Sequence, residues 1–269
     1  MADMAMPEEG EAAMAAILGE EDEWRRIMSE DGEEVLTVYL DIKSPHAYLA
    51  VRPSLMVARD YRVRLDFQPY TLDYVTLGVS TRVDGDMQRR PADAAADRKA
   101  RMYYAAARQY AALQALPFRG PRRLLDSTAA HKAWLFAGRQ GQAVPFLMRV
   151  YLRGWGNGWR DYEVESPEQL RTTLKEAGVD LTDFDAFMKA GGAGDAALAA
   201  CNAAAEATGV TGVPHYVFDD PEAGRRLGLF GREHLALIRE KFHAAGLARR
   251  PDVEAAFSHA WRGPIQAGC

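Results

Sequence analysis

The chain has 269 residues, of which 48% are hydrophobic and 26% charged, and its formal net charge is −5. This length allows a sizeable buried core, and the nearly balanced charge argues against a general nucleic-acid binder. No apolar stretch reaches the roughly 18 residues that span a bilayer. The two cysteines, Cys201 and Cys269, cannot form a disulfide framework, and the histidine spacings predict no metal site.

Acidic residues are concentrated in the first part of the chain. Residues 1–34 contain twelve acidic and two basic residues, whereas the rest contains 26 acidic and 31 basic. We therefore expect 1–34 to form a solvated, partly helical extension, with a docking or regulatory segment as the alternative. An acidic start also differs from the basic start of a secretory signal, so we expect a cytoplasmic protein.

A βαβ unit is predicted directly after this acidic segment. Residues 35–40 are rich in β-branched and aromatic side chains and predict a buried strand. Apolar residues at helical spacing predict a helix over 47–58, and alternation predicts a second strand over 63–67. The crossover through a helix makes the two strands parallel.

The middle of the chain is predicted to be helical. The pattern indicates helices over 92–116, 128–140, 144–153, 166–177 and 195–208, with a glycine- and tryptophan-rich loop over 153–162. Strands then return over 212–218 and 227–230, before an amphipathic helix over 233–245. This order predicts an α/β, thioredoxin-like fold over 35–245 with an all-helical insertion at about 90–208. Residues 246–269 form a C-terminal tail.

The first candidate for chemistry is Ser44, which follows the first strand and precedes Pro45. Unpaired N–H groups and partial positive charge at a helix start favour an anion, and a serine hydroxyl there can donate to a thiolate. Both effects lower the pKa of a bound thiol. The alternative is an ordinary helix start, with serine as the N-cap and proline at the first helical position.

Two later segments are further candidates. Pro214 enters a strand after a Gly-x-Val sequence. A cis-proline there would turn the backbone of Val213 outward, where an extended peptide could pair with it; the alternative is a trans turn proline. Glu233 lies at the start of the last helix, where a carboxylate could bind a ligand ammonium or act as a cap.

Taken together, residues 39–50, 209–214 and 230–234 resemble the 2-hydroxychromene-2-carboxylate isomerases. These belong to the DsbA-like branch of thioredoxin folds, with the kappa-class glutathione transferases, and a serine replaces the first cysteine of their redox motif. The resemblance implies that Ser44 holds the sulfur of glutathione. It further implies that Val213 pairs with the tripeptide beside a cis Pro214.

The resemblance also implies a loop that binds the γ-glutamyl end of glutathione. Glu233 matches an aspartate of the family, Phe230 and Gly231 match its Trp-Gly, and Arg232 occupies an asparagine position. Other differences leave the chromene substrate open, since Thr76 stands where the isomerase has a lysine. No Asn-Arg pair is evident near Arg89 and Arg90.

The expected function is a glutathione-dependent isomerase of an aromatic-degradation type. Its thiolate would add reversibly to a small aromatic or enone-like substrate. The alternatives are a kappa-like glutathione transferase and a non-catalytic DsbA-like binding protein. A dithiol oxidoreductase would need a cysteine near Ser44, which the sequence lacks. Dimers are common in the family, so a homodimer is implied, while no membrane or nucleic-acid partner is expected.

Overall fold

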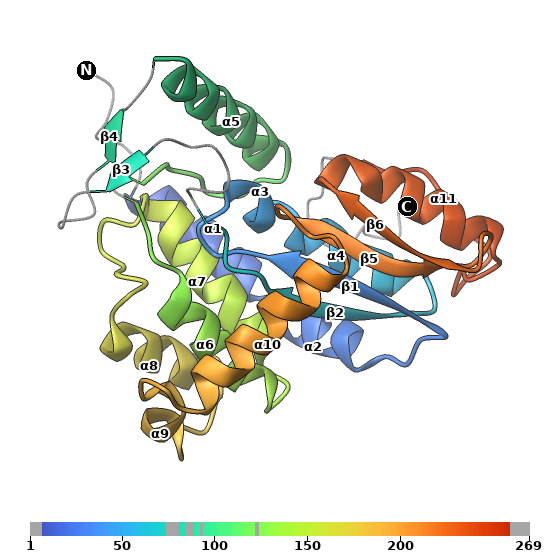
Figure 1. Ribbon diagram of the computed structural model, residues 1–269. Coiled ribbons are helices and arrows are strands. Elements are labelled where there is room, and N and C mark those ends of the chain that lie inside the picture. Colours follow the sequence, from blue (N-terminus) through green and yellow to red (C-terminus); the bar gives the residue numbers. More distant parts are fainter. Residues whose placement is uncertain (1–6, 74–80, 84–88, 92–93, 122–123, 259–269) are drawn as a thin grey trace.

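The computed structural model describes residues 7–73, 81–83, 89–91, 94–121 and 124–258. Its centre is a four-stranded sheet in the order β2-β1-β5-β6 (Figure 1). The strands are β1 (Glu34–Leu40), β2 (Val63–Pro69), β5 (His215–Asp220) and β6 (Arg225–Phe230). β1 is parallel to β2 and antiparallel to β5, which is antiparallel to β6. The predicted α/β thioredoxin-like fold is therefore confirmed.

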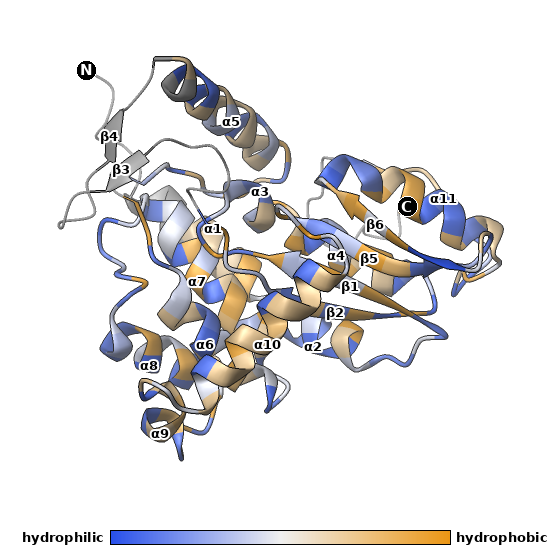
Figure 2. Ribbon diagram, viewed as in Figure 1, coloured by the Kyte–Doolittle hydropathy of each residue, from blue (hydrophilic) through white to orange (hydrophobic). Residues whose placement is uncertain are grey.

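Helices cover both faces of this sheet. In Figure 1, α10 (Ala193–Ala207) crosses in front of it and α4 (Val51–Asp60) lies behind it. Apolar residues are concentrated on the central strands, whereas the turn between β5 and β6 is hydrophilic (Figure 2). The side chains of Leu36, Val38 and Leu40 are fully buried. Burial of these alternating β1 residues is a main source of the stability of the sheet.

The predicted helix over 47–58 is instead two helices, α3 (Pro45–Tyr48) and α4. Pro53 has no backbone N–H, so it cannot donate to the carbonyl of Leu49, and its ring would clash with that carbonyl in a continuous helix. The freed carbonyl oxygen of Leu49 accepts a hydrogen bond from the side-chain amide of Gln114 at 3.0 Å. The break therefore follows from one proline.

The loop predicted over 153–162 is wrong at its beginning, because α7 (Ala143–Asn157) continues through it. Trp155 is fully buried and stacks on Phe118, and a Cβ at Gly154 would overlap the ring of Trp159. The helix ends at Gly158, which has a left-handed conformation with φ of +63°. These glycines thus serve packing and helix termination.

The acidic N-terminal segment is helical, as predicted, but it is not a solvated extension. It forms α1 (Pro7–Leu18) and α2 (Glu21–Ser29), and α2 contacts both α4 and α7. Trp24 and Ile27 on α2 are each 1% exposed, whereas Asp22 faces solvent. The apolar stripe of α2 explains the error, because the net charge of a segment does not show whether one face of its helix is apolar and buried.

The described residues between 94 and 207 form helices and no strand. They comprise α5 (Ala94–Leu113), α6 (Thr128–Gly138), α7, α8 (Pro167–Glu176), α9 (Phe184–Met188) and α10. The sequence did not predict α9, nor the antiparallel pair β3 (Thr81–Val83) and β4 (Arg89–Pro91) that precedes them.

The chain closes with the short 3-10 turn η1 (Arg232–His234) and α11 (Leu235–Ala244). The following residues run back along the domain, since the N–H of Arg62 donates to the carbonyl of Leu247 at 2.8 Å. The guanidinium of Arg239 binds the carbonyl of Glu254 at 2.7 Å. Among the helices of the described residues, none is long and apolar enough to cross a membrane.

Candidate functional site

Ser44 lies in the turn that joins β1 to α3. Its hydroxyl oxygen accepts a hydrogen bond from the N–H of Ala47 at 3.3 Å, as an N-cap does. The hydroxyl hydrogen has no acceptor among the described residues. The predicted helix start is right, but α3 has only four residues, so the field of a long helix is absent here. What Ser44 can offer a ligand is therefore its own O–H.

A buried ion pair underlies this turn. Asp41 is fully buried and accepts hydrogen bonds from the N–H groups of Lys43 at 3.0 Å and Leu72 at 2.8 Å. The Lys43 ammonium lies 3.4 Å from the Asp41 carboxylate and donates to the carbonyl of Leu72 at 2.6 Å. Burial opposes ionisation, yet His131 and Lys43 outweigh it and hold the pKa of Asp41 well below its usual range.

Two side chains of α7 fix the same turn from the other side. The Tyr151 hydroxyl donates to the carbonyl of Asp41, and the Trp155 indole N–H donates to the carbonyl of Ile42, each at 3.2 Å. No role in this turn was predicted for Tyr151 or Trp155, because both lie more than a hundred positions from it in the chain. The signal in the sequence was Asp41 itself. A carboxylate at the end of a buried strand needs hydrogen-bonding or charged partners.

The Val213–Pro214 peptide bond is cis, as the resemblance implies. Neither the N–H nor the C=O of Val213 has a hydrogen-bonding partner among the described residues. Tyr39 of β1 pairs with His215 of β5 in antiparallel register. Because Ser44 follows β1 and Val213 precedes β5, this pairing brings both to the same edge of the sheet.

The segment of residues 230–234 meets this edge as well. The N–H of Gly231 donates to the carbonyl of Pro214 at 3.0 Å. The ring of Phe230 is 56% exposed and packs over Gly212, where a Cβ would lie 2.7 Å from it. Glu233 is exposed, and its carboxylate folds back over Gly231.

Arg232 connects this loop to α5. It is 5% exposed, and its guanidinium lies 4.0 Å from the ring centroid of Tyr110 on α5. Burial, and then the charge of Arg232, lower the pKa of His46 on α3. The three predicted segments therefore converge. Thr76 lies outside the described residues, as do the side chains of Arg89 and Arg90.

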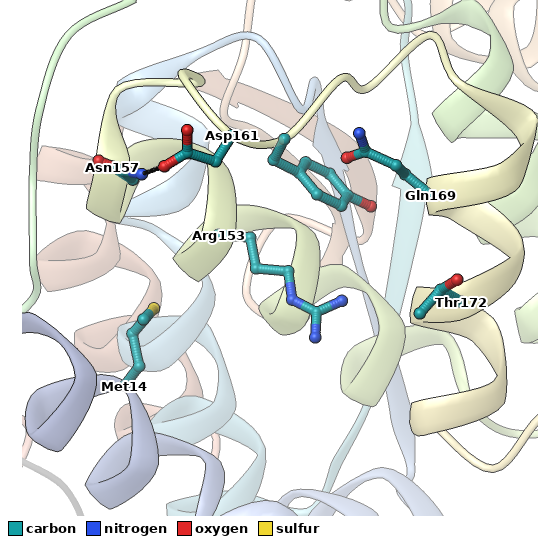
Figure 3. Close-up of a pocket in the computed structure, with 7 residues that line it drawn as sticks. Met14, Arg153, Asn157, Asp161, Gln169 and Thr172 are labelled. Atoms are coloured by element: carbon teal, nitrogen blue, oxygen red, sulfur yellow. Dashed lines mark hydrogen bonds between the residues drawn. The ribbon is translucent and has the colours of Figure 1, made fainter.

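Two cavities differ in their relation to this site. One of about 450 Å³ is lined by residues 70–73, Glu206 and residues 209–211, which directly precede the Val213 loop. The other, of about 350 Å³, lies between α1, α7 and α8, and Figure 3 shows Arg153 reaching into it. None of the predicted site residues lines the second cavity. Within the described ranges, no group of histidines, cysteines and carboxylates is placed to hold a metal ion.

Comparison with known proteins agrees with the fold described above. A family model described as a DsbA-like thioredoxin domain matches residues 35–243. A solved structure of 2-hydroxychromene-2-carboxylate isomerase is similar, with a TM-score of 0.61 and 20% identity over 78% of this chain and 95% of that one. No curated protein sequence matches.

Two DsbA-like redox proteins are similar as well. A probable DsbA oxidoreductase from Streptomyces coelicolor has a TM-score of 0.60 and 18% identity, over 82% of this chain and 93% of its own. The cytosolic disulfide reductase DsbM from Pseudomonas aeruginosa, solved with GSH, has a TM-score of 0.54 and 17% identity, over 79% and 97%. At such identities the likeness concerns the fold.

Proposed function

The chain belongs to the DsbA-like thioredoxin domain family, and we propose that it is a glutathione-dependent isomerase of a small aromatic or enone-like substrate. One observation carries the proposal. The hydroxyl hydrogen of Ser44 has no acceptor among the described residues, and the unpaired backbone of Val213 lies at the same sheet edge. A thiol tripeptide could use both, because its sulfur accepts from the hydroxyl and its backbone pairs with Val213.

The task of Ser44 is to hold glutathione as a thiolate. A free thiol has a pKa of about 8.5, so only a few per cent is ionised at neutral pH. Lowering that pKa by about one to two units, ~1.4–2.7 kcal/mol, makes the thiolate the major form. A charge-assisted hydrogen bond from Ser44 contributes in this range.

The other contacts would place the tripeptide. Val213 pairs with its backbone beside Pro214, and the exposed carboxylate of Glu233 meets the γ-glutamyl ammonium. Phe230 and Gly231 shape the loop that carries Glu233 to this position. The cavity lined by residues 209–211 adjoins the Val213 loop and has room for a small substrate.

The reaction is reversible addition. The thiolate attacks the electrophilic carbon of the enone, forming a carbon–sulfur bond while the double-bond electrons move to the carbonyl oxygen as an enolate. The former double bond can then rotate. Collapse of the enolate restores the double bond in its new geometry and expels the thiolate, so no proton or electron is consumed.

The test compares Ser44→Ala with Ser166→Ala. Ser166 is a matched control, because it also caps a helix before a proline and accepts from an N–H three residues on, at 3.4 Å. Calorimetry with glutathione and ultraviolet absorbance of the thiolate are measured for both. We expect Ser44→Ala to lose thiolate absorbance and Ser166→Ala to retain it.

Two outcomes would contradict the proposal. If the native protein does not bind glutathione at millimolar concentration, the cofactor is wrong. If Ser44→Ala keeps the full thiolate absorbance, the role of Ser44 is wrong. Turnover of chlorodinitrobenzene without isomerisation of a chromene carboxylate would identify a glutathione transferase instead.

A further inference from the structure

Arg232 is a buried cation without a counter-ion among the described residues. Its side chain is 5% exposed, yet its Nε and Nη1 atoms have no hydrogen-bonding partner in the part of the chain that the structure describes. No carboxylate of the described residues forms an ion pair with it. The ring of Tyr110 stacks on the guanidinium, with its centroid 4.0 Å away.

Such an arrangement is costly in the folded protein. Removing an ion from water is costly, and stacking on one aromatic ring returns only part of that cost. Burial accordingly lowers the pKa of Arg232, against the opposing influence of Tyr216, Tyr110 and Glu233. The free hydrogen-bond donors are thus suited to an anion that arrives from outside.

A second unused nitrogen lies in the same surroundings. Nε2 of His46 is buried and has no partner among the described residues, and its ring meets Tyr103 edge-on at 5.9 Å. The charge of Arg232 acts on this ring. His46 comes from α3 and Arg232 from η1, while Tyr103 and Tyr110 both come from α5. The site is therefore built by three elements.

The site formed by Arg232 and His46 adjoins the residues of the proposed reaction. Arg232 follows Gly231, whose N–H binds the carbonyl of Pro214. His46 is two residues beyond Ser44. A ligand extending from the Ser44 turn along the Val213–Pro214 loop would bring an acidic group towards the guanidinium.

We infer that Arg232 is the receptor for a carboxylate of the ligand that reacts beside Ser44, with His46 and Tyr110 as the walls of this receptor. The inference rests on the proposed function for what reacts there. Guanidinium groups are weakly hydrated and planar, and they bind carboxylates well in buried sites. The carboxylate belongs either to glutathione or to the substrate, and the two sources can be distinguished.

The experiment uses calorimetry on the full chain with three probes: glutathione, benzoate and the neutral benzamide. The variants are Arg232→Met, which keeps an apolar stem, and Arg232→Lys. Arg225→Met on the exposed end of β6 is the control. A lost charged hydrogen bond corresponds to about tenfold or more in affinity.

If glutathione supplies the carboxylate, its affinity falls about tenfold in Arg232→Met and benzoate competes with it. If the substrate supplies it, glutathione affinity is unchanged. Benzoate then binds the glutathione-loaded protein about tenfold more tightly than benzamide does, and Arg232→Met removes that preference. Arg232→Lys keeps part of each effect, and Arg225→Met leaves both intact.

The inference is overturned if each of the three probes binds Arg232→Met as tightly as it binds the native protein. In that case, glutathione binding that depends on Ser44 would still support the proposed function. If benzoate binding depends on Arg232 but glutathione does not bind at all, the carboxylate receptor is supported and the proposed function is contradicted. Should Arg232→Met not fold, nuclear magnetic resonance on the native protein decides. Adding the bound carboxylate must then raise the pKa of His46 by neutralising Arg232, and an unchanged pKa overturns the inference.

Discussion

The N–H of Gly231 donates a hydrogen bond to the carbonyl oxygen of Pro214 at 3.0 Å. This single bond joins two segments that the sequence offered as separate candidates. It places the start of η1, with Arg232 and Glu233, beside the unpaired backbone of Val213. The candidate site is therefore one surface at the start of β5 and the end of β6.

Gly231→Ala should destabilise this junction. Gly231 has φ of +113°, a conformation that essentially only glycine adopts. A Cβ would also displace the carboxylate of Glu233, which can move because it is the end of an exposed side chain. We expect a loss of about 1–3 kcal/mol in the free energy of unfolding, measured with urea. Gly224→Ala is the control. Its φ of +61° is also positive but nothing lies within 4 Å, so its loss should be smaller. Equal losses in the two variants would contradict this account of the Gly231 backbone.

Asp41→Asn should be strongly destabilising although the two side chains have nearly the same shape. It leaves the buried Lys43 ammonium without its carboxylate, and removing one partner of a buried pair costs about 3–5 kcal/mol. Chemical denaturation measures the effect. Adding Lys43→Met to Asp41→Asn should recover part of the loss, and a double variant no more stable than Asp41→Asn would contradict this account.

Trp24→Ala should show that the acidic N-terminal segment belongs to the folded domain. Trp24 is 1% exposed, and truncating a buried tryptophan costs about 3–5 kcal/mol. Asp22→Ala on the same helix is the control, since Asp22 is fully exposed, and we expect its unfolding transition to stay in place. Guanidinium unfolding followed by circular dichroism makes the comparison. A Trp24→Ala protein as stable as the native one would restore the interpretation of a solvated extension.

Stability should fall on acidification below pH of about 6.5. Burial first, and then the charge of His234, lower the pKa of His215 from its ordinary value of 6.5; burial and Arg232 lower that of His46 likewise. Below pH of about 6.5 these histidines are protonated in the unfolded chain but remain neutral in the folded chain. The free energy of unfolding therefore falls as the pH falls. The slope is at most about 1.4 kcal/mol per pH unit for each histidine.

Thermal unfolding across pH 5–8 tests this expectation, because His215→Gln should reduce the slope. His243→Gln, at an exposed position of α11, should leave the slope unchanged. A slope that survives in the double variant His46→Asn/His215→Gln would assign it to other groups.

Much of the fold could be predicted because its signals are local. The β-branched strand at 35–40, the capping pair Ser44-Pro45 and the order of strands and helices all act over a few residues. The parallel pairing of β1 and β2 then follows from the crossover. The break before α4 was also available in the sequence, since Pro53 lies inside the predicted helix.

The sequence alone determined the thioredoxin-like order of elements and the three segments that hold candidate residues. Only the tertiary structure decided that Tyr151 and Trp155 fix the Ser44 turn and that Trp24 is core. It also decided that Arg232 is buried with no counter-ion among the residues that are described. The physical reason is that burial and pairing are made between residues far apart in the chain. A local pattern shows that a charged residue is present, but not whether water or another helix will lie beside it.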